Sequence, residues 1–130
     1  SLVPAHADVS SDGTKNLYVP RPVTREALYI FLHECAHHIL GHCRESWEGP
    51  LWKMEYEAEK WAMETMRAEG LHVPRSMIAE AKRYVKECAV EDDNKGRDWP
   101  PAHIHNWMTR RFKVRAKLPE NYRKPKRLEE

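Results

Sequence analysis

Residues 24–42 read Thr-Arg-Glu-Ala-Leu-Tyr-Ile-Phe-Leu-His-Glu-Cys-Ala-His-His-Ile-Leu-Gly-His, a stretch that holds four of the chain's eight histidines. It predicts a helix over residues 24–41. Thr24 is a favourable N-cap, Glu26 places an acid in the first turn, and Gly41 is a favourable end. The apolar residues cover much of the circumference, so we expect this helix to be buried on most sides.

Within this helix, His33-Glu34-Cys35-Ala36-His37 has the form H-E-x-x-H. Positions four apart differ by about 40° around a helix, so the imidazoles of His33 and His37 project side by side and can bind one cation. The Glu34 carboxylate lies close enough to reach a metal-bound water without binding the metal. Two imidazoles and a carboxylate suit Zn²⁺, and the motif predicts a zinc site with Glu34 as the general base of a metallopeptidase.

The third ligand is expected from the next helix, which the 3.6-residue period predicts over residues 51–69. On a helical wheel the apolar stripe extends about 60° to either side of the first residue, with Glu55 at about 40° and Glu59 at about 80°. A carboxylate within an apolar stripe is costly to bury unless it is paired or binds a metal, so Glu55 is the predicted ligand. Glu57 and Glu64 fall on the opposite side and are expected to be solvated.

Other histidines and cysteines have weaker claims to the site. The extended metzincin motif places a third histidine six residues after the second, where this chain has Cys43. Three interpretations of His42 stay open: it supports a ligand, caps the helix end, or is exposed. His38 is expected at the surface or behind a ligand, and Cys35, like Cys43, is expected to be a small buried residue. Three further histidines, His72, His103 and His105, are distant in sequence, and we do not expect them to stabilise an oxyanion in the site.

Two segments resemble the metallopeptidases of the ImmA/IrrE type. Residues 33–42, His-Glu-Cys-Ala-His-His-Ile-Leu-Gly-His, are similar to that family's H-E-x-x-H-x-x-x-G-H helix. Residues 55–62, Glu-Tyr-Glu-Ala-Glu-Lys-Trp-Ala, are similar to its E-x-E-A-N-x-F-A helix. The zinc ligands that this resemblance implies are those of the helical wheel, His33, His37 and Glu55, with Glu34 as the general base.

The resemblance has three departures, and it implies a substrate. Glu59 stands where the family usually has Asn, and Trp61 stands where it has Phe. The family's following Leu-Leu-Met-Pro segment is not seen after Met66. Glu59 adds a carboxylate one turn from Glu55, and it is the alternative third ligand. The resemblance further implies an intracellular peptidase of bacteria, phages or mobile elements. Its substrate would be a partner transcriptional repressor, often of the helix-turn-helix type.

At 130 residues the chain predicts one domain. We expect a small α+β fold, zincin-like and mainly helical, with a short hairpin beside the active-site helix and with the tryptophans in the core. An Asp-Gly pair at residues 12–13 predicts the hairpin turn. The other expected segments are strands over 5–9 and 14–19, a helix over 75–91, a turn over 92–96, a short helix from 100 to 111, a peptidase domain over 1–112 and a basic tail over 113–130.

Charge and composition bear on location and on rival functions. The longest apolar run, Ala27–Leu32, is far shorter than the ~20 residues that cross a bilayer, so no membrane partner is expected. Three cysteines without C-x-x-C spacing suit a reducing compartment, and a cytoplasmic location is expected. Nine Lys/Arg against one Glu over residues 110–127 leave open a zinc-stabilised module that holds a repressor or nucleic acid without cutting it. A structural zinc site using a cysteine is disfavoured, because Cys35 projects about 200° from His33.

Overall fold

The computed structural model describes residues 5–110, which form four helices and one two-stranded antiparallel hairpin. This confirms a small, mainly helical α+β arrangement for the described part of the chain. Its elements are β1 (His6–Val9), β2 (Lys15–Tyr18), α1 (Arg25–Ile39), α2 (Leu51–Ala68), α3 (Arg75–Asn94) and α4 (Ala102–Thr109). The last two helices are, respectively, longer and shorter than predicted. The domain boundary at residue 112 and the basic tail over 113–130 lie outside the described residues.

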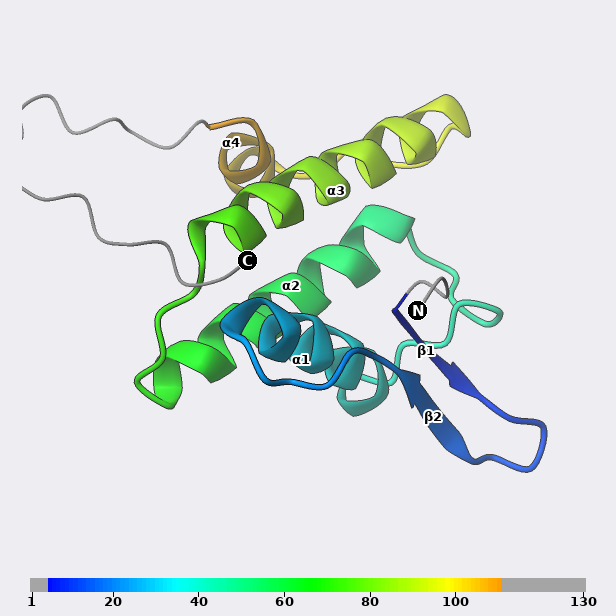
Figure 1. Ribbon diagram of the computed structural model, residues 1–130. Helices are drawn as coiled ribbons and strands as arrows, with labels where there is room; N and C mark the ends of the chain where they lie inside the picture. The colour runs from blue at the N-terminus through cyan, green and yellow to red at the C-terminus, as the bar shows by residue number, and fades with distance from the viewer. Residues whose placement is uncertain (1–4, 111–130) are drawn as a thin grey trace, which may run out of the picture.

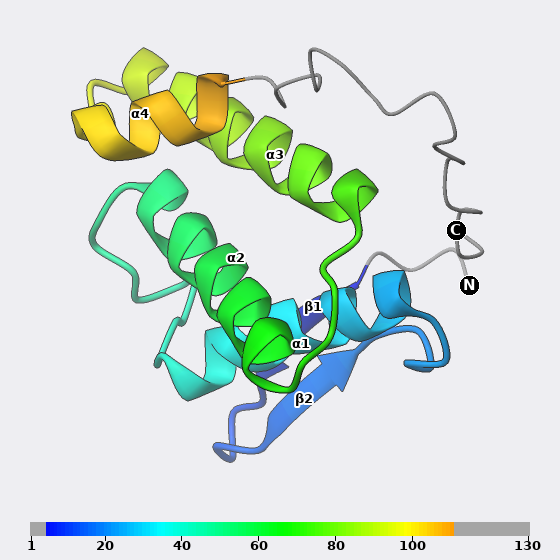
Figure 2. The ribbon, with the colours of Figure 1, turned by 90° about the vertical axis from the view of Figure 1, so that its left-hand side faces the viewer.

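The helices pack side by side with α2 at the centre. Figures 1 and 2 show α1 on one side of α2 and α3 on the other, with α4 against α3 and the hairpin against α1. Because α2 is covered from two sides, eight of its eighteen residues are buried. Over residues 5–110, no helix combines the length and the apolar character that crossing a membrane requires.

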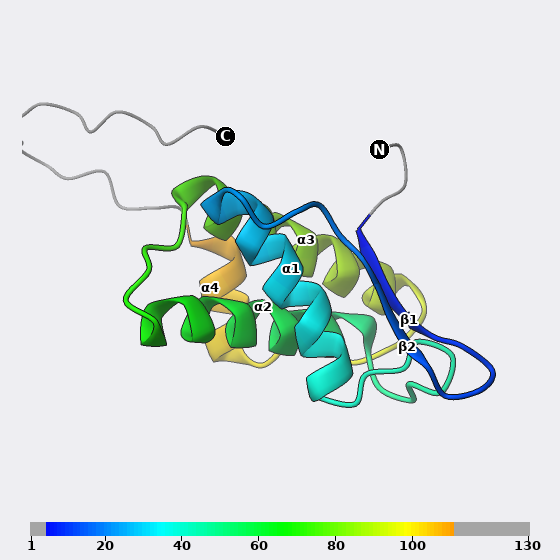
Figure 3. The same ribbon diagram turned by 60° about the horizontal axis from the view of Figure 1, so that its bottom comes forward.

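The hairpin extends past the helices and is tied to α1 by a histidine. Its strands are antiparallel, with His6 opposite Tyr18, and Gly13 in the predicted Asp-Gly turn has a φ of +87°. Figure 3 shows this turn projecting beyond the helices. On the side of α1, the Nε2–H group of His38 donates to the backbone carbonyl oxygen of Asn16 at 2.8 Å. This hydrogen bond fixes the hairpin beside the helix that carries the H-E-x-x-H motif.

Both ends of α1 form as the sequence predicts. Thr24 Oγ1 accepts a backbone N–H of the first turn at 3.0 Å. At the other end Gly41, with a φ of +72°, reverses the chain, and the backbone N–H of His42 donates to the carbonyl oxygen of His37 at 2.7 Å, closing a Schellman motif. The expected burial on most sides is wrong for the last turn, where Ile39 is 61% exposed because the chain reverses there and leaves that face to solvent.

Two apolar clusters hold the helices together, and two glutamates of α2 lie between them. One cluster joins α1, α2 and α3, and the other joins α2, α3 and α4. Glu55 is 2% exposed, which confirms its predicted burial. Glu59 is only 5% exposed as well, because α1 covers its side of α2. Trp52 is buried in the core while Trp99 is 38% exposed, so the expectation for the tryptophans is confirmed in part.

The predicted turn over residues 92–96 is wrong at its first three positions, which continue α3. The reason is Asp92, which is fully buried. Its Oδ2 accepts the backbone N–H of Trp52 at 2.8 Å, and its Oδ1 pairs with Arg97 at 3.1 Å. The N-cap residue of α2 is Pro50, which makes no side-chain capping bond. A residue of α3 therefore caps α2, and this contact holds Asp92 in the helix.

Replacing Asp92 by Ala is expected to destabilise the fold by about 2–4 kcal/mol, because it leaves the buried N–H of Trp52 unpaired and removes the partner of Arg97. Urea denaturation followed by circular dichroism measures the loss. The control is Asp93→Ala at the exposed neighbouring position, which should change the free energy of unfolding by less than about 0.5 kcal/mol. Equal stability of the two variants would contradict the capping role.

Candidate metal centre

Two histidines of α1 and one glutamate of α2 meet in a compact triangle. The Nε2 atoms of His33 and His37 lie 3.1 Å apart, and each lies 3.2 Å from Glu55 Oε1. All three side chains are shielded from solvent, the glutamate most completely. The four-residue spacing of the histidines and the place of Glu55 in the buried stripe of α2 produce this meeting, as predicted. These three side chains could hold a metal ion.

His37 is oriented by hydrogen bonds that lead toward the surface. Its Nδ1 lies 3.0 Å from Nδ1 of His42, whose Nε2 lies 2.8 Å from Glu57 Oε1. Because a carboxylate only accepts, His42 donates to Glu57 from Nε2. In the tautomer that carries its proton there, His42 accepts at Nδ1 from Nδ1 of His37. The Nε2 atom of His37 therefore keeps its lone pair, directed at Glu55. The Schellman turn at Gly41 places His42 for this contact.

His33 has a carboxylate behind it. Its Nδ1 makes a close ion-pair contact with Glu59, although the two groups are not aligned as a hydrogen bond. A negative oxygen beside Nδ1 attracts a proton there, which leaves the Nε2 lone pair facing the triangle. Glu59 thus lies across the ring from Glu55. On the same side is Tyr29, where burial and then the charge of Glu59 raise the pKa of the phenol.

The electrostatics of the centre favour a positive charge. Burial alone would lower the pKa of His33, but the contacts with Glu55 and Glu59 outweigh it and raise the pKa to about 10. Burial would likewise raise the pKa of Glu55, yet the two imidazoles lower that pKa to about 2. Three electron-pair donors that face one another repel unless a proton or a metal cation lies among them. The negative surroundings that favour a proton on His33 also favour a divalent cation.

Glu34 lies beside the triangle without joining it. Its Oε2 is 3.9 Å from His33 Nε2, farther than the ligand atoms are from one another. Burial raises the pKa of Glu34, while His33 and His37, and also His6 of β1, act in the opposite direction. Glu34 is therefore a buried carboxylate next to a group of side chains that could hold a metal ion.

The other sequence-based expectations have mixed outcomes. Of the three interpretations of His42, exposure is wrong, because the residue is buried. Its backbone N–H caps the helix end, and its side chain pairs with His37, which could be a metal ligand. The solvated position expected for Glu57 is wrong in part, because its side chain is 40% exposed but pairs with His42. All three cysteines are free thiols, with Cys35 and Cys43 half-buried. The metal-capable group found among residues 5–110 includes none of the cysteines and none of His72, His103 and His105.

Sequence reasoning missed two side chains near the second oxygen of Glu55. Arg44, from the loop between α1 and α2, places Nη2 at 3.7 Å from Glu55 Oε2. Tyr84, from α3, contacts Arg44. Neither residue lies at a helical spacing from the histidines, so no local sequence pattern predicts that Arg44 and Tyr84 lie near the site. The contact of His42 with His37, by contrast, is indicated by Gly41. A helix that ends at a glycine reverses the chain and brings the next residue back against the last turn.

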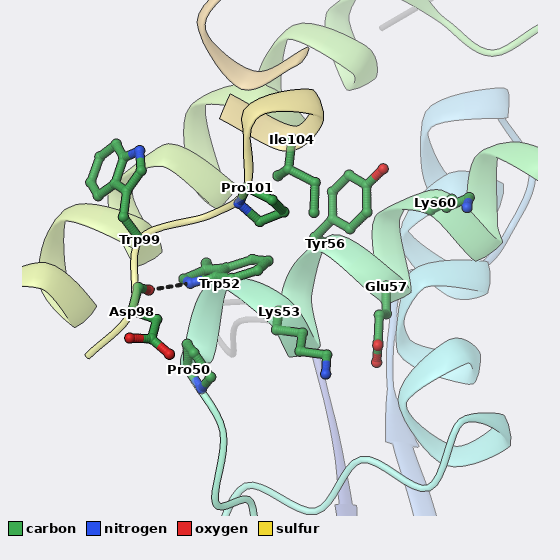
Figure 4. A pocket seen from close by; sticks show the side chains of 10 residues that line it. All are labelled: Pro50, Trp52, Lys53, Tyr56, Glu57, Lys60, Asp98, Trp99, Pro101 and Ile104. Carbon is green, nitrogen blue, oxygen red and sulfur yellow. Dashed lines mark hydrogen bonds between the residues drawn. The ribbon is translucent and has the colours of Figure 1, made fainter. Parts of the chain in front are cut away.

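A separate pocket of about 740 Å³ lies between α2 and the segment that leads into α4 (Figure 4). The apolar part of its lining comprises Pro50, Trp52, Tyr56, Trp99, Pro101 and Ile104. The three metal-capable side chains do not line it. Glu57 is the link between the two places, because it lines the pocket and also binds His42. The pocket is therefore distinct from the metal centre and connected to it through one carboxylate.

Comparison with known proteins adds no relative. No protein-family model matches the chain, and neither a curated protein nor a solved structure matches it. The function is therefore inferred from the geometry of the site.

Replacing His42 by Ala is expected to weaken zinc binding by about 10- to 100-fold, because His37 loses the hydrogen bond that directs its Nε2 lone pair. Competition with a chromophoric chelator measures the affinity. Glu57→Gln should cause a smaller loss. The control, Glu64→Gln at an exposed position of α2, should bind zinc as the unmodified protein does. Unchanged affinity in the His42 variant would show that His37 is oriented without it.

Proposed function

We propose that this protein is a zinc-dependent endopeptidase with the zincin-like arrangement of the ImmA/IrrE-type metallopeptidases. The observation that carries the proposal is the triangle of His33, His37 and Glu55 with Glu34 beside it. Two imidazoles and one carboxylate leave a coordination position for water. That ligand set is typical of catalytic zinc sites, whereas structural sites surround the ion with four protein ligands.

The separation of the ligand atoms supports zinc. A tetrahedral ion with bonds of about 2.0–2.1 Å keeps its ligand atoms about 3.3–3.4 Å apart. The corresponding separations here are 3.1 and 3.2 Å. Imidazole nitrogens also argue against calcium and magnesium, which take oxygen ligands. Other first-row transition metals accept the same donors, so the test begins with metal analysis.

The roles of the chain's own residues follow from their positions. When bound, zinc would lower the pKa of a coordinated water and polarise the carbonyl of the scissile peptide bond. The Glu34 carboxylate accepts a proton from the attacking water and later delivers it to the leaving amine. Glu59 and His42 keep the two histidine rings in the tautomer that presents Nε2.

The substrate class that we propose is a protein. The hairpin beside α1 offers backbone groups to which a peptide can add as a further strand. The similarity of residues 33–42 and 55–62 to ImmA/IrrE-type peptidases supports a transcriptional repressor of a phage or mobile element, often a helix-turn-helix protein, as the particular substrate. Three free cysteines suit the reducing cytoplasm in which such a repressor acts.

Replacing Glu34 by Gln is expected to reduce peptide hydrolysis by about 100- to 10,000-fold, because the amide cannot accept the proton. Zinc should stay bound, since Glu34 lies outside the ligand triangle. Cleavage is measured with a fluorescence-quenched peptide library, and zinc by elemental analysis of protein purified without chelator or added metal. Hydrolysis at the unmodified rate would refute this role of Glu34. Zinc binding without cleavage in either form would favour the rival binding module.

Replacing His33, His37 or Glu55 by Ala is expected to lower the zinc content from about one ion per chain to a small fraction of that, because each change removes one of three ligands. Glu59→Gln should keep its zinc at a reduced affinity, since it removes only the group behind His33. The same elemental analysis measures both. Full zinc content in the Glu55 variant would show that Glu55 is not a required ligand.

A further inference from the structure

A cation borders the second oxygen of the Glu55 carboxylate. Oε1 of Glu55 faces the two histidines, whereas Oε2 lies 3.7 Å from Nη2 of Arg44. Arg44 also interacts with the Tyr84 phenol of α3. Residues from the α1–α2 loop and from α3 therefore lie near the Glu55 carboxylate of α2.

Arg44 lies near Glu55 and makes no hydrogen bond to it. A separation of 3.7 Å is longer than a hydrogen bond, so the attraction to Glu55 is electrostatic and loose. The Arg44 side chain is 67% exposed. A guanidinium presents five N–H donors in a planar fork, and the fork matches the two oxygens of a carboxylate. Arg44 can therefore bind a second carboxylate while staying beside Tyr84.

The charge around the triangle is otherwise negative. Glu34, Glu55 and Glu59 are all buried there. A substrate carboxylate that approached these groups would be repelled, because like charges interact strongly where solvent is excluded. Beside Arg44 the same carboxylate meets a cation that is open to solvent, together with the Tyr84 phenol. The position of Arg44 thus selects where an acidic group of a substrate can lie.

We propose that Arg44, supported by Tyr84, binds a carboxylate of the peptide substrate and makes the enzyme selective for peptides that carry one close to the scissile bond. This inference rests on the proposed function. The carboxylate belongs either to an acidic side chain or to the C-terminus of the substrate, two sources with the same chemistry. Because Arg44 acts on binding, its removal changes KM and leaves kcat largely unaltered.

Selectivity is first tested with the cobalt-loaded protein, whose visible absorption changes when a hydroxamate binds the metal. One probe is acetohydroxamate, and the other is succinic acid monohydroxamate, which adds a carboxylate. The unmodified protein is expected to bind the carboxylate-bearing probe about five- to tenfold more tightly, and Arg44→Met to bind both equally. Arg44→Lys should keep part of the preference. The control Arg83→Met, which removes an exposed arginine of α3, should keep all of it.

Two peptide series then separate the sources of the carboxylate. One series carries an acidic residue and an amidated C-terminus, and the other is neutral with a free C-terminus. Arg44→Met should raise KM about five- to tenfold in the series whose carboxylate Arg44 binds, and should leave KM unchanged in the other series. A normal affinity of this variant for acetohydroxamate shows that it is folded.

The failures of the two proposals are distinguishable. Equal affinity of the unmodified cobalt-loaded protein for both hydroxamates overturns the role of Arg44 and leaves the metallopeptidase proposal standing. So does an Arg44→Met variant that retains the preference for the carboxylate-bearing probe. A chain that binds neither cobalt nor zinc overturns the proposed function, and the role of Arg44 with it.

Discussion

Three electron-pair donors directed at one point in a largely buried site are the constraint on which the rest of this structure depends. The Nε2 atoms of His33 and His37 and the Oε1 atom of Glu55 repel one another unless a positive charge lies among them. Polar groups in such a place persist only if their surroundings are rigid and their outer atoms are paired. The apolar clusters at the two ends of α2 supply the rigidity, and Glu59 and His42 supply the pairing.

The two helices contribute to the centre in different ways. On α1 a four-residue spacing brings two nitrogens together, and the reversal of the chain at Gly41 adds a third imidazole behind the second. On α2 two carboxylates from successive turns reach opposite sides of one ring, with Glu55 at Nε2 of His33 and Glu59 at its Nδ1. A single imidazole is thus clamped between two acids, which fixes both its orientation and the place of its proton.

Local periodicity predicts the hairpin, the first two helices and the ligand triangle, because each is set by spacing along the chain. The burial of Glu59 could not be predicted, since a helical wheel does not show whether a neighbouring helix covers the edge of the apolar stripe. Asp92 has the local preferences of a turn residue, yet it lies in a helix, where its carboxylate bonds to Trp52, forty positions away, and to Arg97. Arg44 and Tyr84 meet through the packing of α3 beside α2, which no single-sequence pattern contains.

Because the metal centre takes Glu55 and Glu59 from α2, an inserted residue affects the centre differently before α2 and inside it. An extra residue in the loop over 45–49 lengthens the connection between α1 and α2 and leaves the phase of α2 untouched. An extra residue inside the first turn of α2 rotates every later side chain by about 100°, which turns Glu55 and Glu59 away from α1. A change of length in that loop therefore disturbs the centre less than one inside α2, where the number of residues from the start of the helix to its two acids has to stay fixed.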